Sequence, residues 1–350
     1  MKKVVFVTGS MIRGGAEGVI ASVVNGLVKR GWKVYIISLL FERCDYELDN
    51  SIECINLATK QQNKFLDSPR MILALRRIIK QLQPEIVVSF MVSINIVTWI
   101  ATRGLKTKYI PSERNDPDKG TNSIIKLLQK KAYGAADVIV FQTTRAMNFF
   151  PKKIRDKGVI IPNPIREMPE ALSERKKRIV TVGRLEEQKN HKLLIDAFSS
   201  VYKTHRDFTV DIYGDGTLKD ELRAFIEERQ LTEVVHLCGK IENVPESIRD
   251  AYMFVLSSDY EGLSNALLEA MAVGLPCITT DCAGSVDVIQ SRENGLIVPV
   301  GNKKDMEAAI SWMIENPTIA RNMGKKARES IRKYNYDNII NQWENLLINW

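Results

Sequence analysis

The chain has 350 residues, of which 45% are apolar and 26% are charged, an ordinary globular composition that excludes a disordered, collagen-like or coiled-coil protein. At about 100–200 residues per domain, this length predicts two domains, each with its own core. The net charge of +8 is unevenly divided, because residues 1–168 hold 27 Lys and Arg against 14 Asp and Glu, and residues 169–350 hold 23 against 28. A basic half (+13) joined to a mildly acidic half (−5) indicates two different partners, of which only one need be polyanionic.

Short β-branched runs alternate with helical patterns through the first half of the chain. Strands are predicted at 4–8, 33–39, 86–90, 109–111, 138–142 and 159–162, and helices at 17–30, 69–82, 94–102, 123–135 and 144–150. Strands that alternate with helices in this way imply βαβ crossovers and a parallel sheet covered by helices on both faces.

The second half repeats this pattern, with strands predicted at 178–182, 209–213, 234–237, 253–256, 277–280 and 295–298. Between the halves, a segment punctuated by prolines and then by charges is interpreted as a linker. The predicted organisation is a first domain at 1–165, a linker at 166–177, a second domain at 178–333 and a final helix at 334–350. The fold class is α/β, with two doubly wound domains in tandem and ligands expected in the cleft between the carboxyl ends of their strands.

The cysteines and the apolar runs predict a cytoplasmic protein, soluble or peripheral to the membrane. The five cysteines are scattered without a CxxC pair or zinc-finger spacing, as expected for reduced thiols: Cys44, Cys54, Cys238, Cys277 and Cys282. The last two flank a predicted strand and are expected in the core. Only about five apolar residues precede Gly9, too few for a signal peptide. The longest apolar stretch, 86–101, is shorter than the ~20 residues of a spanning helix.

Two adjacent glycines, Gly14 and Gly15, follow the first predicted strand and precede the first long helix. Glycines allow the backbone to approach a ligand closely, and the helix N-terminus offers N–H groups to an anion. The same pattern is typical of a plain strand-to-helix turn, so this motif alone leaves both interpretations open.

The segment VGRLEEQKNH follows the first strand of the second half. Gly183 permits a sharp turn that brings Arg184 and Lys189 to the carboxyl end of the strand. A guanidinium fork and an ammonium point charge together suit a diphosphate. A solvated charged loop is the alternative.

The stretch SSDYEGLSNALLEAMA is the most informative. It predicts a loop with Glu261, a helix N-cap at Ser264, and Glu269 inside the helix among apolar neighbours. A half-buried carboxylate needs donors, and the two hydroxyls of a ribose would supply them. Backbone N–H groups near 262–265 can hold phosphate or sugar hydroxyls. An acidic pair favoured by the helix dipole is the alternative, which accounts for Glu261 better than for Glu269.

The ordered motifs GGAEG, VGRLEEQKNHKLLIDAF, IYGDG, SSDYEGLSNALLEAMAVGLPCI and NGLIVP resemble the retaining GT-B glycosyltransferases of family 4, and the E-x7-E element is met by Glu261 and Glu269. The matches run from the first strand to about residue 300. The resemblance implies two Rossmann-like domains and a last helix that crosses back to the first. By this resemblance the first domain recognises the acceptor, and the second holds most of the sugar nucleotide.

By this resemblance, Arg184 and Lys189 would grip the donor diphosphate, Glu269 the ribose and Glu261 the transferred sugar. The glycines of the first domain would approach the donor phosphates, and backbone near 238–240 would hold the base. The implied nucleotide-sugar set is Gly14, Gly15, Gly183, Arg184, Lys189, Gly239, Lys240, Glu261, Gly262, Leu263, Ser264, Asn265 and Glu269.

The resemblance also implies that the enzyme needs no bound metal or other cofactor, because cationic side chains and a helix N-terminus offset the charge of the leaving diphosphate. Asp116 and Asp118 form a DxD sequence, which is a metal-binding motif in a different glycosyltransferase fold. Here the two aspartates lie in a segment that is interpreted as a polar loop. Many family members place a His in this first-domain loop, but His191, His205 and His236 all lie in the second half. We assign to Arg114 the catalytic role that this His has near the reacting sugar in other family members. A structural salt bridge of Arg114 is the alternative.

The basic first domain contains two helical patterns in which cations alternate with aliphatic residues, at 70–80 and 123–131. Such helices bind anionic membranes, although a core-facing helix with a cationic solvent face has the same pattern. No nucleic-acid motif is evident, so nucleic acid is not expected as a partner. The leading hypothesis is a glycosyltransferase that moves a hexose or N-acetylhexosamine from a UDP-sugar to a lipid-linked glycan at the cytoplasmic membrane face. A sugar-nucleotide epimerase and a non-catalytic sugar-nucleotide-binding module are the alternatives.

Overall fold

The computed structural model describes residues 2–12, 14–58, 68–118, 122–165, 169, 172, 174–282 and 284–349. The chain divides into two compact units, Met1–Pro164 with Tyr336–Trp350, and Ile165–Asn335. The first unit ends at Pro164, one residue before the predicted domain boundary. The final helix begins at Tyr336, two residues after its predicted start. Of the predicted linker at 166–177, residues 166–168, 170, 171 and 173 lie outside the described residues.

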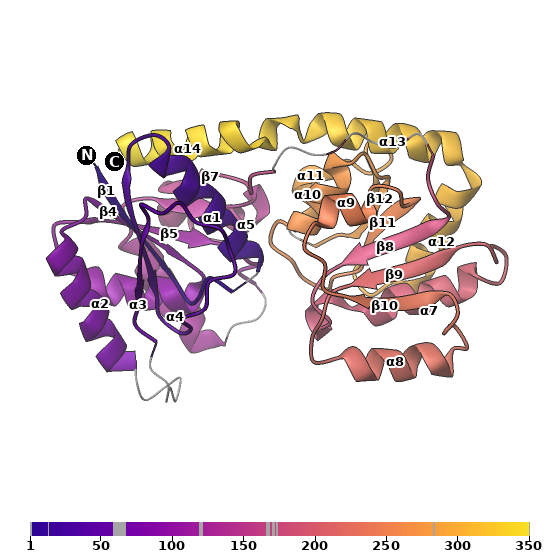
Figure 1. The fold of residues 1–350 in the computed structure, drawn as a ribbon, viewed down its shortest axis with the longest axis horizontal. Helices are drawn as coiled ribbons and strands as arrows, with labels where there is room; N and C mark the ends of the chain where they lie inside the picture. Colours follow the sequence, from indigo (N-terminus) through magenta and orange to yellow (C-terminus); the bar gives the residue numbers. More distant parts are fainter. Residues whose placement is uncertain are drawn as a thin grey trace. The chain divides into compact units, whose positions relative to one another are not determined.

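The first unit is built on a seven-stranded parallel sheet in the order β3-β2-β1-β4-β5-β6-β7 (Figure 1). Its strands are β1 (Lys3–Thr8), β2 (Lys33–Ser38), β3 (Glu53–Asn56), β4 (Ile86–Phe90), β5 (Lys108–Glu113), β6 (Ile139–Phe141) and β7 (Gly158–Ile160). The sequences of the central strands are continuous apolar runs because helices cover both faces of the sheet. Strand β3 was not predicted from the sequence; it is an edge strand whose residues are mostly exposed.

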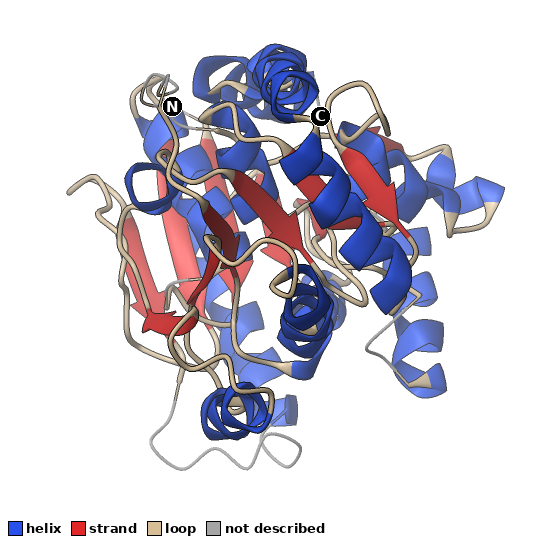
Figure 2. Cartoon of the chain, turned by 90° about the vertical axis from the view of Figure 1, so that its right-hand side faces the viewer, coloured by secondary structure: helices blue, strands red, loops and turns tan. Residues whose placement is uncertain are grey.

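Helices pack on both faces of this sheet, and Figure 2 shows strands lying between helices. They are α1 (Gly15–Val28), α2 (Ser68–Leu82), α3 (Val92–Thr102), α4 (Ser123–Gly134), α5 (Thr144–Asn148), α6 (Lys152–Arg155) and α14 (Tyr336–Asn349). One core cluster joins α2 to the strands through Leu75 and Ile79. A second joins α4 to the strands through Tyr133 and Phe141.

The last helix of the chain, α14, packs on the first unit. Its Trp343 is fully buried, with its ring centroid 6.4 Å from that of Phe6 and 6.0 Å from that of Phe90. On the flank of the helix, Glu344 accepts from Arg30 at 2.8 Å. The last residues of the chain therefore complete the core of its first unit.

The second unit has a six-stranded parallel sheet in the order β10-β9-β8-β11-β12-β13. Its strands are β8 (Arg178–Val182), β9 (Thr209–Tyr213), β10 (Val235–Gly239), β11 (Met253–Leu256), β12 (Cys277–Thr280) and β13 (Leu296–Val298). The prediction of two parallel-sheet, Rossmann-like domains is confirmed.

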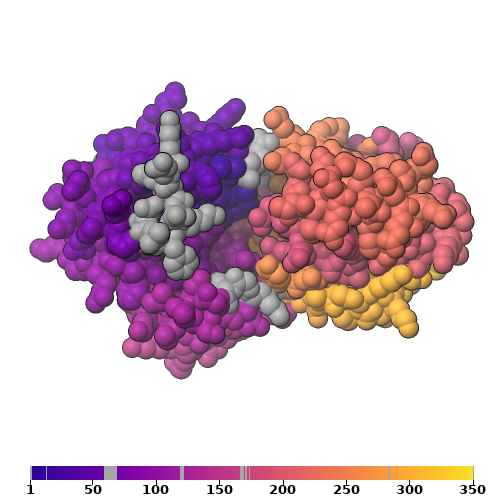
Figure 3. All heavy atoms as spheres, turned by 90° about the horizontal axis from the view of Figure 1, so that it is seen from below, coloured from indigo at the N-terminus to yellow at the C-terminus, as the bar shows by residue number. Residues whose placement is uncertain are grey.

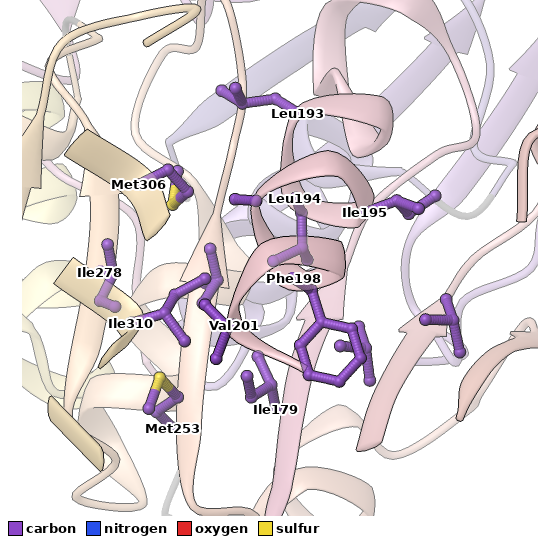
Figure 4. Close-up of a cluster of buried hydrophobic side chains, with 14 of the residues drawn as sticks. Ile179, Leu193, Leu194, Ile195, Phe198, Val201, Met253, Ile278, Met306 and Ile310 are labelled. Atoms are coloured by element: carbon purple, nitrogen blue, oxygen red, sulfur yellow. The ribbon is translucent and has the colours of Figure 1, made fainter. Parts of the chain in front are cut away.

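Helices surround this sheet as well: α7 (His191–Val201), α8 (Lys219–Glu228), α9 (Val244–Ile248), α10 (Asn265–Ala272), α11 (Ser285–Val288), α12 (Lys303–Glu315) and α13 (Pro317–Ser330). Figure 4 shows part of the core, where Leu194 and Phe198 of α7 lie near Ile310 of α12 and Ile179 of β8. Cys277 and Cys282 are buried as expected, and the thiols of Cys44, Cys54 and Cys238 are exposed. Within the described ranges, no helix combines the length and apolar character that a membrane crossing requires.

Candidate active site

The sheet of the second unit has a topological switch point between β8 and β11. The chain runs from β8 outward to β9 and β10, and from β11 outward to β12 and β13 in the opposite direction. In open α/β sheets, ligands bind at the carboxyl ends of the two strands where the order reverses. The loops after β8 and β11 carry most of the residues that the sequence assigned to the donor site.

An ion pair joins these two loops. Lys189, in a 3-10 turn after β8 (Glu187–Lys189), lies with Nζ 2.5 Å from Oε2 of Glu261, in the loop after β11. Both side chains are largely buried, with 12% and 15% of their surface exposed. Each charge is therefore compensated mainly by the other, since little water reaches either group.

Hydrogen bonds outside this pair hold the two loops together. The amide of Asn190 donates to Asp259 at 2.7 Å, and the backbone N–H of Asp259 donates to the carbonyl of Gln188 at 2.9 Å. The side chain of Gln188 donates to the carbonyl of Tyr260 at 3.0 Å. These residues were not predicted to belong to the site, although they are the polar neighbours of Lys189 and Glu261 along the chain.

Two glycines let neighbouring loops approach closely at this edge of the sheet. Gly214 follows β9 with φ of +146°, and a Cβ there would lie 1.8 Å from the carbonyl oxygen of Gly183. A Cβ on Gly284 would lie 1.7 Å from the carbonyl oxygen of Gly262. No side chain fits at either position, so the turns at Gly183 and Gly262 both depend on a facing glycine.

His191, the first residue of α7, also fixes the turn after β8. Its Nε2 lies 3.1 Å from the carbonyl oxygen of Arg184, which makes Nε2 the protonated nitrogen of the ring. Burial lowers the pKa of His191 to about 4, against a smaller opposing effect of this hydrogen bond. The ring is therefore neutral at pH 7 and acts as a structural donor to the backbone.

The other predicted residues after β8 and β10 are more exposed. The Arg184 side chain is exposed, and its Nη2 lies 3.5 Å from Oε1 of Gln188. Gly239 ends β10 with φ of +74°, and its carbonyl accepts from the N–H of Gly214 at 2.8 Å. Lys240 is exposed, with Nζ 4.0 Å from Asp215. The carboxyl ends of β8, β9 and β10 are thus adjacent, with two cations facing solvent.

Helix α10 begins where the sequence predicted. Ser264 is the N-cap, and its hydroxyl accepts from the N–H of Leu267 at 3.4 Å. Gly262 and Leu263 before it are buried, whereas Asn265 and Glu269 are half-buried. Glu269 therefore has the intermediate exposure predicted from its apolar neighbours.

In the first unit, Gly14 and Gly15 lie at the start of α1. Gly14 is the N-cap in an extended conformation. The hydroxyl of Tyr46 accepts from the N–H of Gly14 at 2.9 Å and donates to its carbonyl at 2.7 Å. A side chain far along the sequence thus fixes the turn, which the motif alone did not indicate.

The Arg114 guanidinium is buried in the first unit rather than projecting from a polar loop. It lies 4.7 Å from the ring centroid of Phe90 and 5.6 Å from that of Trp343, and it donates to Asn163 at 3.1 Å. Burial lowers the pKa of Arg114 to about 9, and the neighbouring Glu113 opposes this shift. Among the described residues, Nε and Nη2 have no hydrogen-bond partner.

The carboxylate of Glu113 is held in a buried network that the sequence analysis did not identify. It accepts from Gln129 at 2.6 Å and from Tyr133 at 2.8 Å, and from the backbone N–H groups of Arg114 and Asn115. Burial raises the pKa of Glu113, and these hydrogen bonds partly offset the increase. The network fixes the backbone from which the Arg114 side chain extends.

The predicted polar loop contains both aspartates of the DxD sequence. Asp116 accepts from the N–H of Asp118 at 3.0 Å, and the carbonyl of Asp118 accepts from Lys126 at 2.7 Å. Over the residues that the structure describes, no three His, Cys, Asp or Glu side chains gather as a metal site would require.

Two family models match consecutive parts of the chain. "Glycosyltransferase Family 4" matches residues 13–167, and "Glycosyl transferases group 1" matches residues 165–330. The chain is a glycosyltransferase. Its second unit thus carries the Lys189–Glu261 pair within the matched region of a glycosyltransferase model.

Known proteins agree with this assignment. This glycosyltransferase is 28% identical to N-acetylgalactosamine-N,N'-diacetylbacillosaminyl-diphospho-undecaprenol 4-alpha-N-acetylgalactosaminyltransferase from Campylobacter jejuni, over 95% of this chain and 96% of that protein. Its fold is similar to that of sucrose-phosphate synthase from Thermosynechococcus elongatus, with a TM-score of 0.88 at 16% identity, over 100% and 99% of the two chains. Anabaena HepE in complex with UDP and glucose gives a TM-score of 0.86 at 14% identity, with both chains fully covered. The fold is GT-B.

Proposed function

We propose that this glycosyltransferase moves a hexose or N-acetylhexosamine from a UDP-sugar to a lipid-linked glycan at the cytoplasmic face of the membrane, with retention of the α configuration. The observation that carries the proposal is the Lys189–Glu261 ion pair at the switch point between β8 and β11. At this position the cation can bind a diphosphate, and the carboxylate can bind the hydroxyl groups of a sugar. The pair therefore suits a ligand that contains both groups.

The pair also suggests how the donor binds. The diphosphate replaces Glu261 as the partner of Lys189, with Arg184 as a second cation and the N-terminus of α10 as a source of N–H groups. Glu261 is then released to accept hydrogen bonds from the sugar, and Glu269 accepts from the ribose. The cations and helix dipole offset the charge that grows on the leaving diphosphate, so transfer is expected to need no metal.

The relatives support the choice of substrates. The Campylobacter enzyme is named for transfer of an α-linked N-acetylgalactosamine to a diphospho-undecaprenol glycan, and HepE was solved with UDP and glucose. A UDP-sugar donor and a polyprenyl-diphosphate-linked acceptor are the chemistry that we carry over to this chain.

The exposed stripe of α2 supports a membrane-facing first unit. Arg70, Leu73, Arg77 and Lys80 recur at helical spacing, and all are exposed. On α4, Ile124, Leu127 and Lys131 form a shorter stripe of the same kind, and both helices belong to the purple and magenta surface in Figure 3. Cations beside exposed aliphatic side chains suit an anionic lipid surface, at about 1 kcal/mol per cation.

The donor is tested first by a thermal-shift screen with UDP-, GDP- and ADP-sugars, followed by transfer to polyprenyl-diphosphate-linked glycans with and without EDTA. We expect a UDP-sugar to bind, an α-linked product by NMR, and an unchanged rate with EDTA. A β-linked product would overturn retention. Turnover of the donor without an acceptor would favour the epimerase, and binding without any turnover would favour the non-catalytic module.

The membrane surface is tested by sedimentation with vesicles of phosphatidylglycerol or phosphatidylcholine. Reversal of Arg70, Arg77 and Lys80 to Glu should abolish binding to the anionic vesicles and leave transfer to a short, water-soluble acceptor unchanged. Reversal of Lys303, Lys325 and Lys326, on α12 and α13, is the matched control. Equal binding of both variants would contradict the membrane assignment.

A further inference from the structure

The loop that leads from β1 to the glycine turn of α1 is paired with the loop after β2. The N–H of Leu40 donates to the carbonyl of Gly9 at 2.8 Å. Further along both loops, the N–H of Asp45 donates to the carbonyl of Met11 at 2.9 Å. The pairing of the two strands therefore continues into their loops, and the residue after Asp45 is the tyrosine that holds the turn.

The segment after this tyrosine is fixed to the side of α1. The amide nitrogen of Asn25 donates to the carbonyl of Glu47 at 2.9 Å, and its oxygen accepts from the N–H of Asp49 at 2.9 Å. Tyr46 thus lies between two anchored stretches of backbone. A side chain on an anchored backbone loses less conformational freedom when it forms its own hydrogen bonds.

The hydroxyl of Tyr46 binds both backbone groups of Gly14, as described above. The carbonyl of Gly14 also accepts from the N–H of Gly18 at 3.0 Å, which is the first hydrogen bond of α1. A Cβ on Gly18 would lie 3.3 Å from the Tyr46 hydroxyl and 3.6 Å from its ring. The last glycine of GGAEG therefore leaves room for the tyrosine that fixes the first one.

We propose that Tyr46 is a positioning residue for the donor diphosphate. Its hydroxyl fixes the orientation of the Gly14 peptide, and thereby the course of the backbone that enters α1. A turn that is rigid before the ligand arrives avoids the entropic cost of being ordered by it. The inference rests on the proposed function, in which this turn faces the donor phosphates. Tyr46 acts through the backbone of Gly14 and not by contact with the donor.

Two tyrosine variants provide a matched comparison. Tyr46→Phe removes the hydroxyl at the turn and keeps the ring beside Gly18. Tyr336→Phe is the control, because the hydroxyl of Tyr336 donates to the carbonyl of Ser22 within α1 at 3.0 Å. Each variant loses one phenolic hydroxyl that binds the backbone of α1, so a general loosening of this helix would appear in both.

Binding of UDP and of uridine, measured by calorimetry, separates positioning of the diphosphate from a purely structural effect. Tyr46→Phe should bind UDP about three- to tenfold more weakly, the effect of hydrogen bonds lost at the turn. It should bind uridine, which lacks the phosphates, as the parent does. The KM for the UDP-sugar should rise by the same factor, with the acceptor KM unchanged.

The control variant Tyr336→Phe should match the parent protein in all of these measurements. Unchanged affinity of Tyr46→Phe for UDP would overturn the assignment. So would equal weakening of UDP and uridine, or an equal loss in the control variant, since either would show that the hydroxyl only stabilises the unit.

Gly18→Ala tests the same contact without changing the tyrosine. Its new Cβ crowds the Tyr46 hydroxyl, so UDP should again bind about three- to tenfold more weakly. In the double variant with Tyr46→Phe the two losses should not add, because both act through one contact. Fully additive losses would mean that the glycine and the tyrosine act independently, contrary to the proposal.

The positioning role and the proposed function fail in different ways. If sugar is transferred from a UDP-sugar but Tyr46→Phe binds UDP normally, the positioning role is wrong and the transferase function stands. If no sugar reaches any acceptor but Tyr46→Phe selectively weakens UDP, the proposed function fails and the positioning role remains. A parent protein that binds no UDP would overturn both.

Discussion

Nζ of Lys189 lies 2.5 Å from Oε2 of Glu261 across the point where the strand order of the second sheet reverses. Because both side chains are largely buried, a diphosphate that binds Lys189 must compete with a carboxylate already in place. The energy of the ion pair therefore opposes binding of the nucleotide alone. It is recovered only by a ligand that also offers hydroxyl groups to Glu261.

Glu261→Gln is expected to separate binding of UDP from transfer. Loss of the competing charge should tighten the binding of UDP by about five- to thirtyfold, since a partly buried pair is worth on the order of 1–2 kcal/mol. Transfer should fall on the order of 10²–10³-fold, the effect of losing one group that acts in the transition state. Calorimetry with UDP and a radiolabel transfer assay measure the two effects.

Lys189→Ala should weaken both UDP binding and transfer, in contrast to Glu261→Gln. It also leaves Glu261 largely buried without its cation, which we expect to cost about 1–3 kcal/mol of unfolding free energy. The double variant with Glu261→Gln should recover part of that loss. The control is Lys192→Ala, which removes an exposed cation three residues away. If this variant weakened UDP binding equally, the effect of Lys189→Ala would come from the net charge of the region and not from the ion pair.

Gly214→Ala is expected to be much more destabilising than the same change at Gly301. At Gly214 the new Cβ meets the carbonyl oxygen of Gly183 at 1.8 Å, so the backbone must move. Gly301 has φ of +71° and open space around it, which leaves only backbone strain of about 1 kcal/mol. Urea unfolding should show a loss of about 3 kcal/mol or more for Gly214→Ala, together with weaker UDP binding. Equal losses would contradict the close contact.

His191 should make stability depend on pH below neutrality. Its pKa is about 4 in the folded protein and about 6.5 in the unfolded chain, so between these values the unfolded state binds more protons. The stabilisation is complete above pH 6.5 and is lost as pH falls towards 4, by about 3 kcal/mol in total. Urea unfolding at pH 7, 6 and 5 measures this slope.

The matched variant is His191→Gln, which keeps a donor for the carbonyl of Arg184 and removes the titrating ring. The difference in stability between the two proteins should shrink as pH falls from 7 to 5. A difference that stays constant with pH would mean that His191 is not the group responsible.

Arg114→Ala should reduce both stability and transfer. Loss of contact with the rings of Phe90 and Trp343 should cost about 1–2 kcal/mol of unfolding free energy. If Arg114 also binds substrate, transfer should fall further than unfolding explains, measured where the variant is fully folded. Arg103→Ala, which removes an exposed guanidinium over Trp99, is the control. Transfer at the parent rate would show that Arg114 is only structural.

Much of this fold could be predicted because its central strands are continuous apolar runs between polar turns. The predicted bounds of β4, β8, β9, β11 and β12 agree with the structure residue for residue. The N-cap of α10 was also predicted, since a serine before an apolar helix has a local physical preference. Such features depend on neighbours along the chain, which a single sequence contains.

Features that depend on contacts between distant residues could not be predicted. The edge strand β3 is stabilised by pairing with β2, while its own residues are mostly exposed. Strand β5 continues to Glu113, beyond the proline where its predicted end was placed, because its last residues pair with β6. The partners of Arg114 come from β4, the segment after β7 and the last helix, so its burial had no local signal.

Trp343, in helix α14 after the whole second unit, packs against Phe6 and Phe90 in the core of the first unit. During synthesis from the N-terminus, residues 165–335 therefore leave the ribosome before the first unit can bury these rings. The second unit can reach its native state first, and the earlier part of the chain must wait for the last helix. A nascent chain stalled before residue 336 would expose an incomplete core, a substrate for chaperones or proteases.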